Sequence, residues 1–172
     1  IFNEIKHYFN SVDFSPDDVT VGFPCFDHRE IIAATDCLLD LRLSQGEKVK
    51  KFEKDFSNYV GTKYGVATNS GSSANLISLT ALIDCGYLSL GDEVILPATT
   101  FATVLSPIIQ CGLKPVLVDV DKESLNICPE AIKKAVTEKT GLIMVVHTLG
   151  CPANMEEINK IAKDNNIFIL ED

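Results

Sequence analysis

The chain has 172 residues, 46% of them hydrophobic, and a formal net charge of −9, a composition that suits a globular α/β domain with a buried core. Its lysines are scattered rather than gathered on one stripe, which disfavours nucleic-acid binding because phosphate neutralisation needs a concentrated basic surface. The longest apolar stretch near the end, residues 142–146, is far too short to span a membrane, and no basic-then-apolar segment at the start predicts export.

Six cysteines bear on both metal binding and compartment. No two of them form a CxxC pair, whereas a zinc site needs close pairs and a disulfide scaffold is typical of short secreted chains. We therefore expect no metal site. We expect free, mostly buried thiols in a cytoplasmic protein, at Cys25, Cys37, Cys85, Cys111, Cys128 and Cys151.

The first part of the chain predicts an arm and two helices. Residues 1–20 are polar and irregular, which predicts an N-terminal arm or part of a preceding element. The chain does not begin with Met, so we expect its true start to lie upstream. Asp27 followed by Glu30 has the pattern of a capping box and predicts a helix start. Residues 46–61 repeat apolar side chains every three or four positions, which predicts an amphipathic helix that ends at Gly61.

From Tyr64 onward, strand-like and helix-like segments alternate. Runs that are apolar on both faces and separated by helices indicate βαβ units and a mostly parallel sheet. Because the chain stops directly after a buried strand, we expect it to be the first part of a longer protein. The expected strands are residues 64–68, 93–97, 114–120, 141–147 and 167–170, and the expected helices are residues 73–84, 100–111, 129–136 and 154–165.

The joint between the first of these strands and its helix, TNSGSSANL at residues 68–76, is rich in small and hydroxyl-bearing residues. Unpaired N–H groups at a helix N-terminus form an anion site together with the helix dipole. Serine hydroxyls add hydrogen-bond donors, and glycine lets a phosphate come close to the backbone. The P-loop lysine and GxGxxG are both absent, so neither nucleoside triphosphate nor dinucleotide binding is indicated. A plain capped turn explains the same residues, and the pattern alone leaves both interpretations open.

Two further residues stand at expected strand ends. Phe101, in PATTFATV, lies at the edge where α/β proteins bind ligands, and its ring can stack on a flat cofactor. Asp172, in ILED, can meet a protonated ring nitrogen and so help the ring act as an electron sink. Taken singly, Phe101 also suits a hydrophobic core and Asp172 a helix cap.

The order of these three features matches one family. From about Gly22 to Asp172 the sequence resembles the DegT-type, pyridoxal-phosphate-dependent nucleotide-sugar aminotransferases and dehydrases. The implied fold is α/β, a three-layer, mostly parallel sheet like the large domain of a type I pyridoxal-phosphate enzyme, with residues 21–172 as its incomplete N-terminal part. The shared segments are LSQGEKVKKFEKDFSNYVGTKYGVATNSGSSANL, LGDEVILPATTFATV, VDVD, HTLGCPANM and ILED.

The resemblance also implies a role for each candidate residue. Gly71, Ser72 and Ser73 would hold the phosphate of pyridoxal 5'-phosphate or pyridoxamine 5'-phosphate, mostly through backbone N–H groups and hydroxyls. Phe101 would stack against the pyridine ring, and Asp172 would pair with the ring nitrogen. No catalytic residue is expected within the chain, because the Schiff-base lysine, or the histidine that replaces it, and the C-terminal small domain would lie beyond Asp172.

The implied activity is that of an enzyme acting on a nucleotide-linked keto sugar, in deoxy- or amino-sugar or lipopolysaccharide O-antigen biosynthesis. SGSSANL with HTLG resembles the 3-dehydrase that acts on a CDP-linked 4-keto-6-deoxyhexulose, whereas PANM resembles the aminotransferases, so both activities stay open. The implied partners are a nucleotide sugar, an amino donor such as glutamate for an aminotransferase, and a second copy of the chain in a homodimer. The alternatives are a non-catalytic phosphate- or nucleotide-binding α/β module and a degenerate homologue. The 172 residues by themselves are expected to be inactive.

Several other polar residues are expected to have structural roles. His147 ends a strand, where an acid–base role is open but a structural one is favoured. Asn154 stands where the family usually has aspartate and can still cap a helix. The helical lysines belong to solvated faces, where burial does not lower their pKa, so none is a Schiff-base candidate: Lys48, Lys50, Lys51, Lys54, Lys133, Lys134, Lys160 and Lys163.

Overall fold

The computed structural model describes residues 1–12, 26–41 and 43–172, which form two compact units, Ile1–Ala67 and Thr68–Asp172. Within these residues, no helix combines the length and apolar character that a membrane crossing requires. The elements in chain order are α1 (Phe2–Ser11), α2 (His28–Leu39), α3 (Glu47–Val60), α4 (Gly71–Asp84), β1 (Glu93–Pro97), α5 (Ala102–Gln110), β2 (Lys114–Val118), α6 (Pro129–Ala135), β3 (Thr140–Val145), the short 3₁₀ turn η1 (Thr148–Gly150), α7 (Met155–Asn165) and β4 (Phe168–Glu171).

The first unit begins with a helix where an irregular arm was expected. Phe2, Ile5 and Phe9 recur at helical spacing within α1, and this short apolar pattern outweighs the polar composition. Residues 2–11 are thus helical rather than irregular, which fits the alternative of part of a preceding element, while residues 13–20 lie outside the described part of the chain. The arm over residues 1–20 as a unit of the chain stays a prediction.

The predicted capping box at the start of α2 is confirmed. The Asp27 N–H donates to Glu30 Oε2 at 2.8 Å, and the Arg29 N–H donates to Asp27 Oδ1 at 2.7 Å. The two reciprocal bonds satisfy N–H groups that the helix itself cannot pair.

Helix α3 ends as predicted at Gly61, whose φ of 76° is the left-handed conformation that glycine adopts without strain. The strand expected over residues 64–68 does not form. Gly65 instead lies so close to α3 that a Cβ there would be 2.8 Å from the Glu53 carbonyl oxygen. The Ala67 N–H donates to Glu53 Oε1 at 2.9 Å, so this backbone bonds to a helix side chain rather than to a neighbouring strand.

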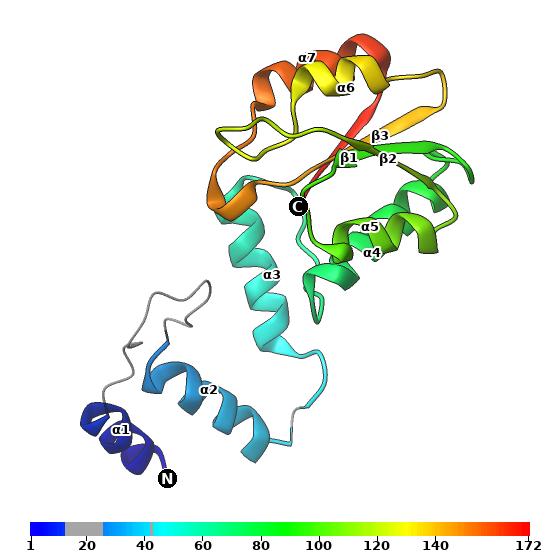
Figure 1. Ribbon diagram of the computed structural model, residues 1–172. Coiled ribbons are helices and arrows are strands. Elements are labelled where there is room, and N and C mark those ends of the chain that lie inside the picture. The colour runs from blue at the N-terminus through cyan, green and yellow to red at the C-terminus, as the bar shows by residue number, and fades with distance from the viewer. Residues whose placement is uncertain (13–25, 42) are drawn as a thin grey trace. The chain divides into compact units, whose positions relative to one another are not determined.

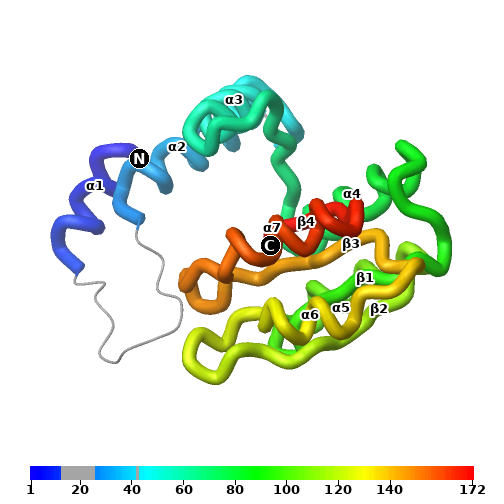
Figure 2. Tube along the Cα trace, turned by 90° about the horizontal axis from the view of Figure 1, so that it is seen from above, coloured from blue at the N-terminus to red at the C-terminus, as the bar shows by residue number. Residues whose placement is uncertain are grey.

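The second unit contains a four-stranded parallel sheet in the order β2, β1, β3, β4 (Figure 2). The four later strands and four helices predicted from the sequence are all present, with bounds that shift by a few residues. For example, β2 ends at Val118 rather than at residue 120, because Val120 forms an antiparallel bridge with Ile127 outside the sheet.

Neighbouring residues of each central strand enter different hydrophobic cores. Ile95 packs with Ile132 of α6 and Ile158 of α7, whereas Leu96 packs with residues from α4 and α5. Figure 1 shows these two helix pairs on opposite faces of the sheet. Burial on both faces explains why the strand sequences are continuously apolar rather than alternating, and the three predicted layers are confirmed.

The strand order determines where a ligand can enter. From β1 the chain crosses to β2 on one side, and it then returns past β1 to β3 on the other side. The segments leaving β1 and β3 therefore diverge at their carboxyl ends. Such a topological switch point opens a crevice at the edge where α/β proteins bind ligands.

The described cysteines are free, as predicted, but none is fully buried. Cys85 and Cys151 are exposed, and the other three are half-buried. The expectation of mostly buried thiols is wrong because Cys85, Cys111 and Cys128 stand at helix caps, where side chains meet solvent. Cys25 lies outside the described residues.

Candidate functional site

A cavity of about 530 Å³ opens at the carboxyl edge of the sheet. It lies at the switch point, and segments that follow all four strands contribute to its wall. Its size and its mostly apolar wall with a few polar groups are typical of small-molecule sites. The residues that line it are Thr99, Thr100, Phe101, Leu125, Val146, His147, Thr148, Leu149 and Asp172.

Two of the predicted site residues, Phe101 and Asp172, share this cavity. Phe101 is the residue directly before α5, and 75% of it is exposed, so it is not a core residue of the described chain. Asp172 follows β4, and its N–H donates to the Val145 carbonyl at 2.8 Å, which extends the pairing with β3 by one residue. The sheet therefore brings together, in one cavity wall, an aromatic ring and a carboxylate that lie far apart in the sequence.

The Thr100 hydroxyl is the third notable group of the cavity wall. Its Oγ1 is buried and has no hydrogen-bond partner within the described residues. A buried hydroxyl without a partner costs about 1–3 kcal/mol. Thr100 itself lines the cavity, which makes it a candidate ligand contact that sequence reasoning missed.

The serine-rich turn forms the first turn of α4. Ser70 caps the helix, its Oγ accepting from the Ser73 N–H at 3.2 Å. In the described part of the chain, the N–H groups of Gly71 and Ser72 donate no hydrogen bond. A Cβ added to Gly71 would meet no atom within 4 Å, so open space lies beside these donors. The turn therefore has the free donors and the room that an anion requires.

The serine-rich turn and the cavity are neighbouring but separate hollows. Ser72 and Ser73 line a smaller hollow of about 190 Å³ together with Ala102 and Thr103 of α5. Phe101, which directly precedes Ala102, lines the larger cavity. Neither hollow includes Gly71 in its wall. The start of α5 thus forms the boundary between the two hollows.

Asn75 joins α4 to the carboxylate, and the sequence reasoning missed it. Its side chain donates from Nδ2 to Asp172 Oδ1 at 2.9 Å and, at a longer 3.5 Å, to the Thr103 carbonyl. Only 5% of Asn75 is exposed. An asparagine inside the apolar run ANLISLTAL is a signal that could have been noticed, because a buried amide in a helix needs a partner.

His147 is held by both of its ring nitrogens. Nδ1 accepts from the Ala153 N–H at 3.1 Å, so the proton lies on Nε2, which is 3.0 Å from Glu171 Oε2. With both nitrogens engaged, the ring ties the loop after β3 to β4 and to the segment before α7. This geometry supports the structural role that was favoured from the sequence.

Asn126 fixes the two loops that form one wall of the cavity. This residue is 2% exposed, donates to the Cys151 carbonyl at 2.9 Å and accepts from the Thr148 N–H at 2.9 Å. The loops carry Leu125 and Leu149, which adopt φ values of 57° and 52°. Bulky residues rarely take this conformation, so the surrounding contacts must hold them there.

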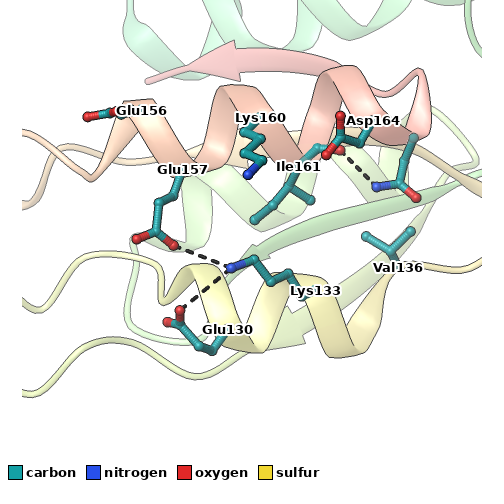
Figure 3. A pocket seen from close by; sticks show the side chains of 9 residues that line it. Glu130, Lys133, Val136, Glu156, Glu157, Lys160, Ile161 and Asp164 are labelled. Atoms are coloured by element: carbon teal, nitrogen blue, oxygen red, sulfur yellow. Dashed lines mark hydrogen bonds and ion pairs between the residues drawn. The ribbon is translucent and has the colours of Figure 1, made fainter.

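A larger hollow of about 710 Å³ lies between α6 and α7, on the outer layer (Figure 3). Lys133 extends between two carboxylates, its Nζ 3.7 Å from Glu130 and 3.4 Å from Glu157. The hollow carries more carboxylates than lysines, which does not suit an anionic ligand, and none of the predicted site residues lines it. The cavity at the carboxyl edge is therefore the better candidate site.

The three layers and the cavity at the switch point are typical of α/β proteins that bind small ligands at the carboxyl edge of the sheet. Sequence comparison gives the family, because residues 24–172 match the model of the DegT/DnrJ/EryC1/StrS aminotransferase family. The chain therefore belongs to this family, as the resemblance indicated.

Two relatives illustrate the activities in the family. The chain is 41% identical over 160 residues to GDP-4-keto-6-deoxy-D-mannose 3-dehydratase of Yersinia pseudotuberculosis, covering 90% of this chain and 41% of the relative. It is 32% identical over 155 residues to GDP-perosamine synthase of Caulobacter vibrioides, covering 90% and 41% respectively. The chain thus spans about two fifths of the length of these curated relatives.

A solved structure shows the same fold. The E. coli GDP-4-keto-6-deoxy-D-mannose-3-dehydratase with bound hydrated pyridoxal phosphate has a TM-score of 0.84 and 39% identity, covering 90% of this chain and 40% of that one. The predicted architecture of a type I pyridoxal-phosphate large domain, present in part, is confirmed.

Proposed function

We propose that this chain is the N-terminal part of the large domain, over residues 21–172, of a pyridoxal-phosphate-dependent enzyme that acts on a nucleotide-linked keto sugar. The reaction is a 3-dehydration or an amino transfer in deoxy-sugar, amino-sugar or lipopolysaccharide biosynthesis. The observation that carries the proposal is that Phe101 and Asp172 line one cavity at the switch point of the sheet. The named activities of the relatives support it.

The residues present fit pyridoxal phosphate. The free N–H groups of Gly71 and Ser72 and the hydroxyl of Ser73 would bind its phosphate, since an anion is stabilised at a helix N-terminus. The exposed ring of Phe101 would cover one face of the cofactor ring. When bound, the cofactor supplies an electron sink, and Asp172 would hold the proton on the ring nitrogen.

The dehydratase is the better supported of the two reactions. The relative at 41% identity is a 3-dehydratase, whereas the synthase of an amino sugar is at 32%. The Schiff-base lysine, or the histidine in its place, is expected beyond Asp172. The same proposal includes a homodimer in the cytoplasm and a nucleotide-sugar substrate. For amino transfer it also includes an amino donor such as glutamate.

The first test is cofactor binding by the full-length protein. Titration with pyridoxal phosphate should produce saturable visible absorbance. Phe101→Leu should weaken the affinity by about 2- to 10-fold, because aromatic contacts contribute about 0.5–1.5 kcal/mol beyond burial. Tyr87→Leu is a matched control, since Tyr87 is 59% exposed but packs against Phe168, away from the cavity wall. A full-length protein that does not bind the cofactor would refute the proposed function.

The second test concerns the carboxylate. Asp172→Asn in the full-length protein should bind pyridoxal phosphate yet lose most turnover, because a neutral amide cannot hold the proton of the ring nitrogen. Asp164→Asn, at an exposed position on α7, is the control with the same chemical change and should keep wild-type turnover. Unchanged turnover of Asp172→Asn would refute the role given to Asp172.

A further inference from the structure

Asn75 is one of the few buried polar residues of the second unit. It lies in the second turn of α4, whose first turn carries the free N–H groups of Gly71 and Ser72. The helix around it is apolar and packs against α5. Burying an amide in such a place is unfavourable unless it is hydrogen-bonded, so the identity of its partner indicates its purpose.

The main partner of Asn75 is the carboxylate of Asp172. The bond from Nδ2 to Asp172 Oδ1 is 2.9 Å long, against 3.5 Å to the Thr103 carbonyl. A bond to a charged acceptor is also the stronger kind. Within the described residues, Asp172 Oδ2 accepts no hydrogen bond, so one oxygen is fixed and the other is available to the cavity.

We propose that Asn75 is a positioning residue for the reaction. It fixes the rotation of the Asp172 carboxylate by occupying Oδ1 and leaves Oδ2 for the ring nitrogen. Because Asn75 and the serine-rich turn belong to one rigid helix, the same bond also sets the spacing between the phosphate contacts and the carboxylate. This inference rests on the proposed function, because Asn75 can position Asp172 for the reaction only if Asp172 contacts the cofactor ring.

The test is a double-mutant cycle on the full-length enzyme with Asn75→Leu, Asp172→Asn and both together. Leucine has the same branched skeleton of four side-chain heavy atoms as asparagine but donates no hydrogen bond. Asn75→Leu should lower kcat by about 10- to 100-fold, the effect of losing a hydrogen bond to a charged group, and leave KM within about twofold. In the Asp172→Asn background the same change should have almost no further effect on kcat, because the two side chains act as a unit.

A second variant and a control separate positioning from folding. Asn75→Asp is also close in size and replaces the donor by an acceptor, so it should lose at least as much kcat as Asn75→Leu. Thr80→Ala alters an exposed residue of the same helix, where Oγ1 donates to the Leu76 carbonyl, and should keep wild-type kcat. The visible absorbance of bound pyridoxal phosphate should change in both Asn75 variants and not in Thr80→Ala.

The outcomes are distinguishable. The inference is supported if Asn75→Leu loses kcat and if its effect is not additive with that of Asp172→Asn. If the Asn75→Leu protein does not fold, Asn75→Asp is measured in its place. Fully additive losses, or wild-type kcat in the Asn75 variants, would overturn it while an active wild-type enzyme leaves the proposed function standing. A wild-type protein that neither binds pyridoxal phosphate nor turns over a keto sugar would overturn both.

Discussion

Single charged and polar side chains serve different purposes at the two edges of the sheet. At the carboxyl edge, Asp172 Oδ2 accepts no hydrogen bond within the described residues, which leaves it available to a ligand in the cavity. At the amino edge, Glu93 is satisfied within the chain: Lys114 Nζ is 2.9 Å from Oε1, and Thr137 Oγ1 donates to Oε2 at 2.6 Å. Glu93 is therefore a structural carboxylate that joins β1, β2 and the segment before β3.

Glu93 should make the stability of the protein depend on pH. The ion pair with Lys114, followed by the bond from Thr137, lowers the pKa of Glu93 below its ordinary value of 4.5. A lowered pKa in the folded state gives stability that is present above pH 4.5 and is lost as the pH falls through the folded-state pKa. Glu93→Gln should therefore be less stable than the wild type at pH 7, and the difference should shrink at about pH 3.

Urea unfolding of the full-length protein at the two pH values measures this difference. Glu123→Gln is the control, because Glu123 is an exposed loop residue and should show no such dependence. A stability difference for Glu93→Gln that is equal at both pH values would contradict the prediction.

At the scale of elements, similar side-chain caps begin α4 on one face of the sheet and α7 on the other, but we expect them to have different roles. Ser70 caps α4 through the Ser73 N–H, and Asn154 caps α7 by accepting from the Glu157 N–H at 3.3 Å. The cap at Asn154 confirms the expectation from the sequence. Only α4 begins beside the predicted phosphate contacts, so only its cap is expected to matter for cofactor binding as well as for stability.

The paired variants Ser70→Ala and Asn154→Ala test this difference. Each should lower the free energy of unfolding by about 0.5–2 kcal/mol, because an N–H group at the helix start loses its acceptor. Ser70→Ala should also weaken the binding of pyridoxal phosphate, as measured by absorbance titration, whereas Asn154→Ala should not. Equal effects of both variants on binding would show that the first turn of α4 is only structural.

At the scale of the second unit, the sheet separates two hydrophobic cores, and each of their buried side chains belongs to only one of them. Ile132 belongs to the core under α6 and α7, and Ile108 to the core under α4 and α5. Both are fully buried. A change in one core therefore has no shared neighbour through which to affect the other, except through the strands themselves.

Ile108→Val and Ile132→Val should each lower the free energy of unfolding by about 0.5–1.5 kcal/mol, because each removes one buried methyl group. The double variant should show the sum of the two effects to within about 0.5 kcal/mol, since the sites share no partner. Urea unfolding of the full-length variants measures this. A clear departure from the sum would mean that the sheet transmits repacking from one face to the other.

Much of the secondary structure could be predicted from the sequence because its signals are local. The strands over residues 93–97 and 114–118 are short apolar runs between turn residues, and the caps at Asp27 and Asn154 are set by side chains within three positions. The prediction of a strand over residues 64–68 is wrong, because the local apolar pattern does not show that the Ala67 N–H donates to the Glu53 side chain. The roles given to Gly71, Ser72, Ser73, Phe101 and Asp172 stay predictions.

The sequence by itself determined the parallel α/β class and, through its motifs, the family, because periodicity and short motifs are properties of neighbouring residues. Only the tertiary structure decided that Phe101 and Asp172 line one cavity, and that Asn75 donates to a carboxylate 97 positions further along the chain. The physical reason is the crossing of the chain from β2 over β1 to β3, which brings distant strand ends to one edge. No local pattern encodes which buried amide will meet which carboxylate there.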